Sequence, residues 1–397
     1  MHCTLRLPRF GPSLPATLLA TLTAVLPATL TAALPCAVIA CVALMCHAPA
    51  QAAKKKVAVS AMAVADSAPD VVTYGARDDV MRFAAEVAER RGLSAVAVQA
   101  ALQQARFIPS VAKFIMPPPV GTAKNWAAYR ARFVEPVRVR AGAAFWRANE
   151  KWLKLAEQLY GVPPEIVVGI IGVETIYGQQ MGNFRVIDAL ATLAFDFPAG
   201  RKDRSAFFRD ELEQFFVLCQ SEGLDPLQPK GSFAGAMGMP QFMPSSFNKY
   251  AVDLDGDGHA DLRNNPADVI GSVAHYLAEF GWQRGQPTRF DVAAPVDTAE
   301  RAVLLGPDIL PSFSAPEFAQ HGARLAEAAL AFEGKLALVE LQNGEAAPSY
   351  VAGTANFYAI TRYNWSSYYA MAVIDVGEAV LREVTREVTR DDTRGPR

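Results

Sequence analysis

The sequence predicts an α+β protein in which helices predominate, and two observations support this prediction. Apolar residues recur with the 3.6-residue period of an amphipathic helix over most of residues 78–280, between residues that typically cap helices. The alternation of apolar and polar residues that is typical of strands appears only within residues 335–358. The predicted sheet is therefore small and lies late in the chain.

The helical segments follow one another from residue 78. The first ends at Gly92, and Ser94 is placed to cap a second helix that continues to Phe107. Residues 126–160 predict one or two long amphipathic helices that end at Gly161. Further helices are predicted over residues 164–177, 186–195, 205–222 and 266–280.

The last of these helices carries clear boundary residues, and the strands follow it. Asn265 is placed as its N-cap, Pro266 occupies its first position and Gly281 follows its end. Residues 335–341 and 350–358 predict two strands, joined by a hairpin turn at Asn343-Gly344. Residues 282–334 are rich in Pro and Ala and predict no definite element.

The N-terminal part of the chain, residues 1–52, is predicted to be a signal peptide, and residues 53–70 a flexible tether. Two Arg residues precede a stretch from Leu14 to Met45 that has no charge, and the small residues Ala50 and Ala52 predict cleavage after Ala52. Three Pro residues interrupt this stretch, which argues against a membrane-spanning helix.

A lipoprotein signal is the alternative interpretation of the same segment. The sequence Val38-Ile39-Ala40-Cys41 fits a lipobox, which would leave a lipid on Cys41 and the protein at the outer membrane. Against it, the apolar run continues beyond Cys41 to Met45. A soluble mature form is therefore favoured, and both interpretations predict export to the periplasm.

The composition of the remaining chain gives no indication of nucleic-acid binding. The leader removes two of the 38 basic residues and none of the 40 acidic ones, so 36 − 40 leaves a formal charge of −4. Four of the five cysteines lie in the leader, and the lone Cys219 is predicted to be a small core residue. Residues 382–397 repeat a short charged unit and predict a disordered tail, and we expect a monomer.

Glu174 is the first candidate for chemistry, because it lies in an otherwise apolar helical run over residues 164–177. At helical spacing it lies beside Ile170, Ile171 and Tyr177, which is the buried side. Burial disfavours the ionised carboxylate and raises its pKa, and a carboxylic acid that stays protonated near pH 7 is what glycosidic bond cleavage needs. The alternative is a structural acid that accepts a neighbouring hydrogen bond.

Residues 231–247 predict a binding loop. Their glycines allow the backbone to approach a ligand closely, their Met and Phe residues supply apolar walls, and Ser232 and Gln241 offer neutral groups suited to sugar hydroxyls and N-acetyl groups. A tightly packed loop without a ligand is the alternative. A later aromatic segment, residues 357–369, interleaves rings with Asn and Arg and also suits carbohydrate, although aromatic core clusters are common.

An acidic turn predicts a calcium site. Asp253, Asp255 and Asp257 occupy positions one, three and five of an EF-hand-like loop, with Gly258 at position six and the backbone carbonyl of His259 at position seven. Position twelve is Asn264 and not Glu, so Asp268 in the next helix is the candidate that closes the shell. A solvated acidic turn is the alternative.

Four motifs occur together in one order, and together they resemble the membrane-bound lytic murein transglycosylase B family. They are Gly-Val-Glu-Thr with Tyr-Gly, then Gly-Ser-Phe-Ala-Gly-Ala-Met-Gly with Gln-Phe-Met-Pro-Ser-Ser, then Asp-Gly-Asp-Gly-His, then Ile-Thr-Arg-Tyr-Asn with Tyr-Tyr-Ala-Met-Ala. The resemblance covers residues 74–381. The calcium loop departs from the family by one additional residue before its closing acid.

The resemblance implies a lysozyme-like core, an extra helical domain and a small domain that carries the calcium loop. On this basis the helical part covers residues 71–160, the core residues 161–250 and 351–381, and the small-domain part residues 251–350. Glu174 is implied as the catalytic acid/base and calcium as a structural ion. The implied glycan-binding residues are Tyr129, Ser232, Gln241, Tyr276, Tyr363, Asn364 and Tyr369.

The predicted activity follows from a count of carboxylates. Most glycosidases use two acids, whereas the motif around Glu174 supplies one, with Asp188 and Asp196 as the nearest acids downstream. We therefore expect non-hydrolytic cleavage of peptidoglycan strands that leaves 1,6-anhydromuramoyl ends. A hydrolytic muramidase and a non-catalytic peptidoglycan-binding protein are the alternatives.

Overall fold

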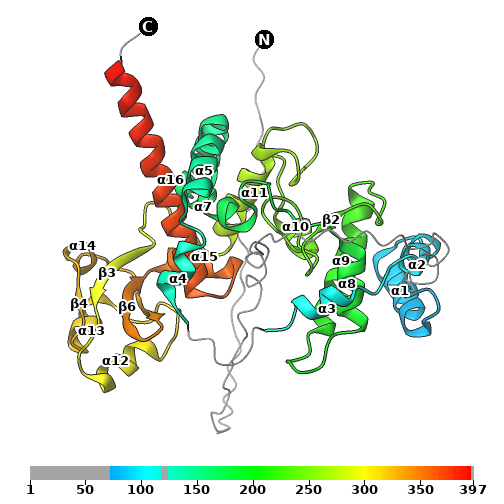
Figure 1. Cartoon of the computed structure of the whole chain (residues 1–397), viewed down its shortest axis with the longest axis horizontal. Helices are drawn as coiled ribbons and strands as arrows, with labels where there is room; N and C mark the ends of the chain where they lie inside the picture. Colours follow the sequence, from blue (N-terminus) through cyan, green and yellow to red (C-terminus); the bar gives the residue numbers. More distant parts are fainter. Residues whose placement is uncertain (1–71, 118–123, 395–397) are drawn as a thin grey trace, which may run out of the picture. The chain divides into compact units, whose positions relative to one another are not determined.

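The computed structural model describes residues 72–117 and 124–394. The predicted signal peptide, including Cys41, and the predicted tether lie outside the described residues. The chain is mostly helical with a small sheet, as predicted (Figure 1). Within the described ranges, no helix combines the length and the apolar composition needed to cross a bilayer.

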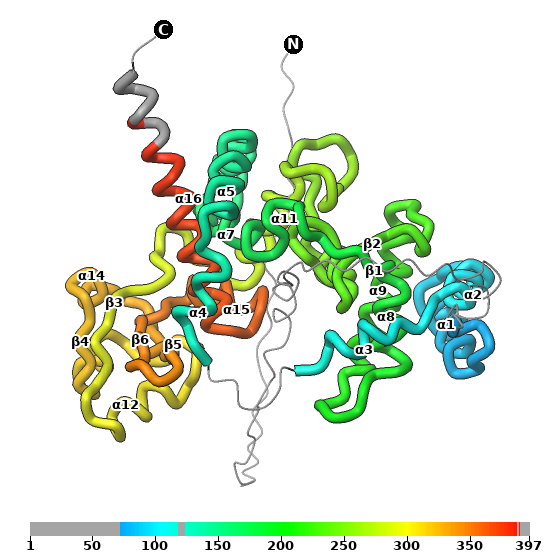
Figure 2. Tube along the Cα trace, viewed as in Figure 1, coloured from blue at the N-terminus to red at the C-terminus, as the bar shows by residue number. Residues whose placement is uncertain are grey.

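The first apolar cluster is built around two helices that pack against each other, α7 and α16. The course of the chain through it can be followed in Figure 2. Its elements are α4 (Trp126–Ala131), α5 (Pro136–Ala148), α6 (Glu150–Tyr160), α7 (Pro164–Thr175), α11 (Pro266–Glu279), α15 (Ala355–Tyr363) and α16 (Ser367–Arg394).

Two glycines allow α7 and α16 to approach closely. A Cβ atom on Gly169 of α7 would overlap the backbone carbonyl of Val373, and one on Gly377 of α16 would overlap the carbonyl of Glu165. The backbones of the two helices are therefore in contact at both glycines. This contact holds the C-terminal end of α7 beside the first turn of α16.

The second apolar cluster joins the N-terminal helices to the middle of the chain. The helices α8 and α9 pack against each other, α3 packs on α8, and α10 connects α9 to α11. Its elements are α1 (Asp78–Arg91), α2 (Ala95–Gln103), α3 (Pro109–Phe114), β1 (Phe184–Arg185), α8 (Val186–Phe195), α9 (Ser205–Ser221), β2 (Lys230–Gly231) and α10 (Pro244–Tyr250).

The third apolar cluster contains the sheet. Four antiparallel strands run in the order β4-β3-β6-β5, so β5 lies at an edge. The elements are β3 (Arg289–Ala293), α12 (Thr298–Leu305), α13 (Ala315–Gln320), β4 (Arg324–Leu325), α14 (Glu327–Leu330), β5 (Ala337–Asn343) and β6 (Ala346–Gly353).

Most predicted helix boundaries are confirmed by their capping geometry. The Ser94 and Asn265 side chains accept hydrogen bonds from the amides of Ala97 and Ala267, and Gly92 and Gly161 end their helices in the left-handed conformation. Residues 126–160, however, form three helices, because Glu135-Pro136 and Asn149 each start a new one. Cys219 is buried, as predicted.

The predicted hairpin is also present, but its second strand begins and ends earlier than predicted. Gly344 takes a positive φ of 67° in the turn, and β6 ends at Gly353 and not at residue 358. The Thr354 side chain accepts a hydrogen bond from the amide of Asn356 and starts α15 there. Residues 355–358, which were predicted to belong to the strand, therefore lie in a helix.

The prediction of a disordered tail from residue 382 is wrong as far as Arg394, because α16 continues to that residue. Side-chain ion pairs join Arg382 to Glu378 and Arg386 to Glu383, one turn apart. Arg and Glu also favour helix, so a charged repeat at this spacing can extend a packed helix.

The predicted division into parts also differs from the observed packing. Helices α4–α6, predicted to belong to a separate helical part, pack in the cluster of α7 and α16, and so does α11. Helices α8 and α9, predicted to lie in the core with Glu174, pack with α1–α3. The period of a helix identifies its apolar face but not the partner of that face, which is why the boundaries were wrong.

Candidate active site

Glu174 lies in the last turn of α7, among buried apolar residues, and its side chain is half-buried. The Tyr369 hydroxyl, from the first turn of α16, donates a hydrogen bond to Glu174 Oε1 at 2.7 Å. Removal of the carboxyl from water raises its pKa to about 7, although the Tyr369 bond favours the ionised form and opposes this shift. The carboxyl can therefore give up and take back a proton near neutral pH.

No second carboxylate of the described residues influences the pKa of Glu174. Asp188 accepts hydrogen bonds from Arg185 and from the amide of Arg106. Asp196 accepts them from Tyr74 and Arg77. Both acids are held by partners in the second cluster, so neither is free to act with Glu174.

Three of the predicted tyrosines surround the carboxyl. Burial raises the pKa of each of Tyr276, Tyr363 and Tyr369, and the nearby charge of Glu174 raises it further. The rings of Tyr363 and Tyr369 are stacked, with centroids 6.3 Å apart. These residues come from α11, α15 and α16, so the tertiary structure brings together tyrosines that are far from Glu174 in the sequence.

The hydroxyls of two of these tyrosines bind backbone carbonyls. Tyr276 donates to the carbonyl of Arg362 at 2.8 Å and Tyr363 to that of Pro240 at 2.6 Å. Their rings therefore serve as walls, while the Tyr369 hydroxyl alone reaches the acid. Asn364 directly follows α15 in extended backbone and is half-buried.

The predicted binding loop is tied to α7 through Thr175. The Thr175 hydroxyl donates to the carbonyl of Met239 at 2.9 Å and accepts from the amide of Gly178 at 3.0 Å. Thr175 follows Glu174 directly, so the same turn of α7 holds both the acid and the loop. Sequence analysis did not assign this role, although the Glu-Thr pair in the motif was a signal for it.

Within the loop, Gln241 and Ser232 already make local hydrogen bonds. The Gln241 amide nitrogen donates to the carbonyls of Gly238 and Met181, and Gln241 has a positive φ of 53°. The Ser232 hydroxyl accepts from the amides of Ala234 and Ala236. Both side chains therefore shape the loop, and strain at Gln241 is typical of a functional segment.

The chain turns sharply directly after Glu174. The helix ends at Thr175, and Ile176 and Tyr177 both take the left-handed conformation, with φ of 49° and 55°. The prediction that this helix continues to Tyr177 is therefore wrong by two residues. Two consecutive bulky residues in the left-handed conformation are strained, and such strain is concentrated at functional sites.

Two further residues support this turn and were missed by the sequence analysis. Among the described residues, the buried hydroxyl of Tyr177 has no hydrogen-bond partner, and it lies where side chains on Gly142 or Gly172 would overlap it. Buried Arg138 donates to the carbonyl of Gly172 at 3.0 Å. An Arg in an amphipathic helix carries no sequence signal for such a role.

Tyr129 lies in a separate aromatic group. Its ring packs with those of Trp126, Phe133 and Tyr368. Tyr368 and Tyr369 are consecutive on α16. The aromatic group around Tyr129 therefore lies beside the side of α16 from which Tyr369 contacts Glu174.

The acidic loop brings together three of the predicted ligands. Carboxylate oxygens of Asp253, Asp255 and Asp268 lie within 4.8 Å of one another. Asp257 is not part of this group, and its carboxylate accepts from the amide of His259. The His259 imidazole pairs with Glu222 at 2.8 Å, so the imidazole is engaged outside this group of carboxylates.

Comparison with known proteins places the chain in a family. A family model for the transglycosylase SLT domain matches residues 75–378. The chain belongs to this family. The resemblance to the murein transglycosylase B family is confirmed by a relative, membrane-bound lytic murein transglycosylase B of Escherichia coli K12, which is 41% identical over 310 residues, 76% of this chain and 82% of the relative.

Solved structures of SLT-family enzymes agree with this assignment. Soluble lytic transglycosylase SltB1 of Pseudomonas aeruginosa is 38% identical and superposes with a TM-score of 0.70 over 77% of this chain and 99% of that one. Escherichia coli lytic transglycosylase Slt35 in complex with calcium is 38% identical, with a TM-score of 0.67 over 78% of this chain and 94% of that one. The predictions of a lysozyme-like fold and a lytic transglycosylase are confirmed.

Proposed function

We propose that this lytic transglycosylase cleaves the β-1,4 bond between N-acetylmuramic acid and N-acetylglucosamine without water, with Glu174 as the single acid/base. The observation that carries the proposal is a lone carboxyl with a pKa of about 7, in contact with a tyrosine hydroxyl and influenced by no other charge of the described residues. Such a group changes its protonation state readily near neutral pH.

In the first step Glu174 donates its proton to the departing glycosidic oxygen. The positive charge that develops at the anomeric carbon needs a partner, and the N-acetyl group of the muramoyl sugar supplies it in place of a second carboxylate. In the second step the ionised Glu174 removes the proton of the sugar's own C6 hydroxyl, which attacks the anomeric carbon. The first step leaves Glu174 in the state that the second step requires.

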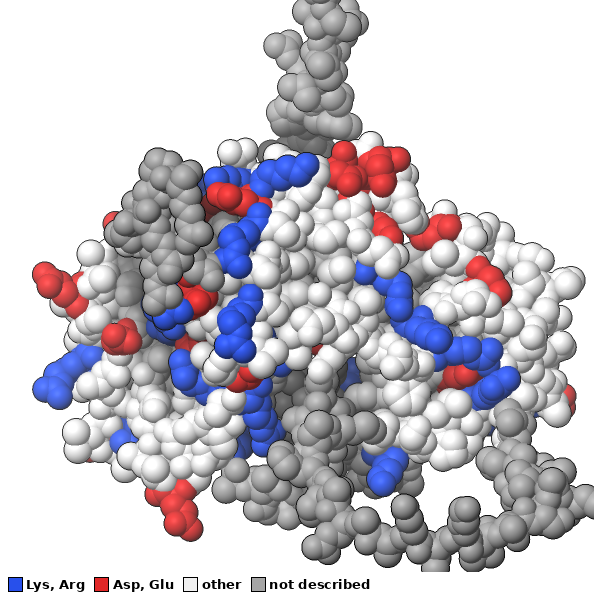
Figure 3. Space-filling view, turned by 45° about the horizontal axis from the view of Figure 1, so that its top comes forward, with Lys and Arg blue, Asp and Glu red and all other residues white. Residues whose placement is uncertain are grey.

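We assign the glycan groove to the residues around Glu174. The rings of Tyr276, Tyr363 and Tyr369 offer planes for sugar C–H faces, and the amide oxygen of Gln241 is available to an N-acetyl N–H. Asn364 directly follows Tyr363 at the end of α15, and Ser232 lies in the same loop as Gln241. Tyr129 extends the groove from α4. Figure 3 shows short rows of Lys and Arg with wide uncharged areas between them, which suits a glycan better than a nucleic acid.

The products decide between this mechanism and the alternatives. A hydrolytic muramidase would need a second acid to activate water, whereas Asp188 and Asp196 are held elsewhere. We expect muropeptides from purified sacculi to resist borohydride reduction and to take up no label from oxygen-18 water. Reducible, labelled ends as the major product would mean hydrolysis, and a lack of any cleavage would favour a binding protein.

Substitution of Glu174 completes this test. Glu174→Gln keeps the volume and the hydrogen bond from Tyr369 but cannot transfer a proton, so we expect cleavage to fall at least 1,000-fold. Glycan binding should remain, as measured by sedimentation with sacculi. Asp188→Asn is the matched control and should retain cleavage, because Asp188 bonds with Arg185 and Arg106 and not with the site.

We also propose that the acidic loop binds calcium as a structural ion. The donor set of Asp253, Asp255 and Asp268 consists of carboxylate oxygens, which hard cations prefer, and the three acids repel one another without a cation. The backbone carbonyl of His259 and the carboxylate of Asp257 would complete the shell. Calcium takes no part in the chemistry.

The mature protein is proposed to act in the periplasm on peptidoglycan strands, either as a soluble monomer or with a lipid on Cys41 at the outer membrane. The relative from Escherichia coli is named as membrane-bound. The mass of the mature N-terminus would distinguish the two forms. A free terminus after Ala52 supports the soluble form, and a lipid-modified Cys41 supports the other.

A further inference from the structure

The backbone of Met239, in the binding loop, is bonded to two segments that lie far from each other in the sequence. Its carbonyl accepts from the Thr175 hydroxyl at 2.9 Å, and its amide donates to the carbonyl of Leu262 at 2.8 Å. Thr175 directly follows Glu174, and Leu262 belongs to the acidic loop, residues 253–268. One residue of the binding loop therefore contacts both the turn that carries the acid and the candidate calcium site.

The contact between the binding loop and the acidic loop is close. Gly238 takes a positive φ of 71°, and a Cβ atom on it would lie 2.4 Å from the carbonyl oxygen of Leu262. Leu262 is 1% exposed. Packed backbone segments cannot yield as a flexible side chain can, so a shift of Leu262 moves Gly238 and Met239 with it.

Asp268 holds Leu262 in place through the residue that precedes it. The amide of Asp261 donates to one carboxylate oxygen of buried Asp268 at 2.9 Å, and the amide of Leu254 donates to the other at 2.9 Å. Asp268 is also one of the three acids whose oxygens lie within 4.8 Å of one another. Because these charges repel one another, a bound cation would fix the Asp268 carboxylate and, with it, Asp261 and Leu262.

Thr175 forms the other end of this connection. Its side chain is fully buried, and its hydroxyl also accepts from the amide of Gly178 at 3.0 Å. A hydroxyl can donate and accept at once, which a Val side chain of the same shape cannot do. The two bonds hold the strained turn at residues 176–177, directly after Glu174.

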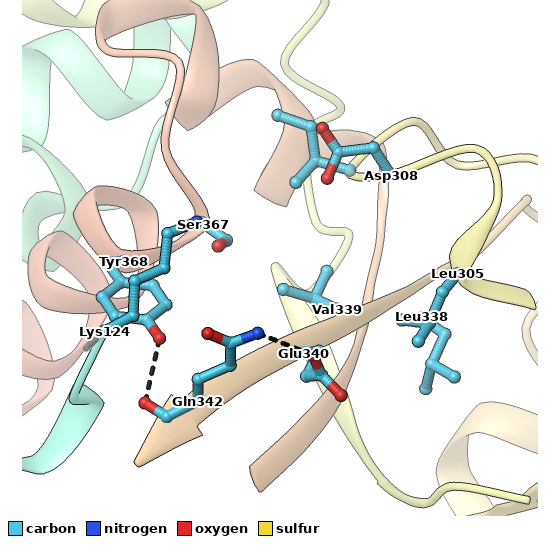
Figure 4. A pocket seen from close by; sticks show the side chains of 10 residues that line it. Lys124, Leu305, Asp308, Leu338, Val339, Glu340, Gln342, Ser367 and Tyr368 are labelled. Atoms are coloured by element: carbon cyan, nitrogen blue, oxygen red, sulfur yellow. Dashed lines mark hydrogen bonds between the residues drawn. The ribbon is translucent and has the colours of Figure 1, made fainter. Parts of the chain in front are cut away.

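Tyr369, the partner of Glu174, is held by a different part of the molecule. It lies in the first turn of α16, where the hydroxyl of neighbouring Tyr368 donates to the carbonyl of Gln342 on β5 at 2.9 Å (Figure 4). This bond lies beside a cavity of about 240 Å³, whose lining includes neither Thr175 nor the binding loop. A movement of the acidic loop therefore shifts Glu174 relative to Tyr369.

The acidic loop can act on Glu174 by position but not by charge. The ionisable groups that face Glu174 are Tyr276 of α11, Tyr363 of α15 and Tyr369 of α16. Among the described residues, no carboxylate of the acidic loop influences its pKa, and neither does any group of α5 or α6, which also pack on α7. A change of this pKa on calcium binding would therefore report altered burial or an altered bond from Tyr369.

We propose that the Thr175 hydroxyl and the Met239 backbone form a positioning link that adjusts the Glu174 carboxyl to the occupancy of the acidic loop by a divalent cation. The proposal deepens the proposed function and rests on it. A bound cation fixes the loop and keeps Glu174 buried beside Tyr369. Without the cation, Leu262 and Met239 shift, water reaches the carboxyl, and less of the acid form remains near neutral pH.

The test measures the pKa of Glu174 by carbon-13 NMR of its carboxyl carbon, whose signal is identified by its loss in Glu174→Gln. In the wild-type protein we expect this pKa to be about one unit lower in EDTA than in millimolar calcium chloride, a usual size for coupling between two sites. The alkaline limb of kcat/KM against pH should move downward by the same amount. The NMR measurement does not require cleavage, so it tests the link independently of the proposed function.

Three variants show whether Thr175 makes the connection. In Thr175→Val the difference in pKa between calcium and EDTA should vanish and kcat should fall about 10- to 100-fold, while calcium still raises the melting temperature. Thr175→Ser keeps the hydroxyl and should restore both properties. Thr192→Val is the matched control, because the Thr192 hydroxyl on α8 is equally buried and bonds the amide of Ile108 and the carbonyl of Arg106.

Equal pKa values of Glu174 in calcium and in EDTA would overturn the proposal, and this comparison needs the wild-type protein alone. A calcium effect that persists in Thr175→Val, or that Thr192→Val loses to the same extent, would also overturn it. A melting temperature that does not respond to calcium would remove the site and this inference with it. Equal cleavage by Glu174→Gln and the wild type would instead refute the proposed function.

Discussion

The Tyr369 hydroxyl and the apolar surroundings of α7 act on the Glu174 carboxyl in opposite directions. Burial favours the protonated acid, whereas the hydrogen bond at 2.7 Å favours the ionised form. The result is a pKa of about 7, between the value of a free carboxyl and that of a fully buried one. One residue can therefore act first as an acid and then as a base.

Removal of the Tyr369 hydroxyl should shift the pH dependence of cleavage. In Tyr369→Phe the pKa of Glu174 should rise by about one unit, because a hydrogen bond to a charged group is worth about 1.5 kcal/mol. The acid form is needed first, so the alkaline limb of kcat/KM against pH should move upward by the same amount. Tyr363→Phe is the control, since its hydroxyl donates to the carbonyl of Pro240. An equal shift in both variants would contradict a specific role of Tyr369.

The same pKa predicts how Glu174 affects stability. The pKa of Glu174 in the folded protein, about 7, lies above the ordinary glutamate value of 4.5, so this residue costs no stability below about pH 4.5 and costs progressively more as the pH rises to about 7. Glu174→Gln should therefore be more stable than wild type at pH 8, by about 3 kcal/mol or less. Urea unfolding at pH 4.5 and pH 8 measures this difference. A gain that is the same at both pH values would refute the assigned pKa.

At the scale of elements, the contact of α7 with α16 sets the geometry of the site. Gly169 and Gly377 allow the two backbones to touch, and this contact places Tyr369 beside Glu174. The site therefore depends on two residues that contribute no chemical group to it.

Gly169→Ala should separate these helices. A Cβ there overlaps the carbonyl of Val373, which cannot move as a flexible side chain can, so we expect a loss of about 1–3 kcal/mol in unfolding free energy and lower cleavage. The control is Gly306→Ala, where φ is −56° and the nearest contact is 3.2 Å away. Chemical denaturation and sacculus digestion measure the two effects. Similar losses in both variants would show that the close helix contact is not responsible.

At the scale of the whole molecule, the acidic loop lies between segments of different clusters. Asp253, Asp255 and Asp257 precede α11, which packs in the cluster of α7, while His259 pairs with Glu222 at the end of α9. Buried Asp268 accepts from the amides of Leu254 and Asp261 and so holds both ends of the loop. An ion bound here would stabilise the junction.

Calcium should therefore raise the melting temperature, and EDTA should lower it. A ligand present at 100 times its Kd adds about 2.7 kcal/mol to the stability of the native state. Asp255→Ala should abolish the response, whereas Asp297→Ala, which removes an acid that caps α12, should keep it. A melting temperature that does not change between millimolar calcium and EDTA would exclude the site.

Much of this molecule follows from local sequence alone. Helix starts at Ser94 and Asn265, helix ends at Gly92 and Gly161, and the turn at Gly344 depend on residues a few positions apart, so their sequence suffices to predict them. The buried acid at Glu174 and the acidic loop are also local features, because one helical turn or one short loop contains them. The motifs around them identified the family before any packing was known.

Other features were decided only by the tertiary structure. The pairing of Tyr369 with Glu174 joins residues 195 positions apart, and it depends on two glycines that allow α7 and α16 to touch. The absence of Asp257 from the group of Asp253, Asp255 and Asp268 and the turn at Ile176 and Tyr177 likewise depend on which surfaces meet. Periodicity shows that a face is apolar, but the partner of that face is selected by the fit of shapes across the whole chain, and this fit determines the geometry and the pKa of the site.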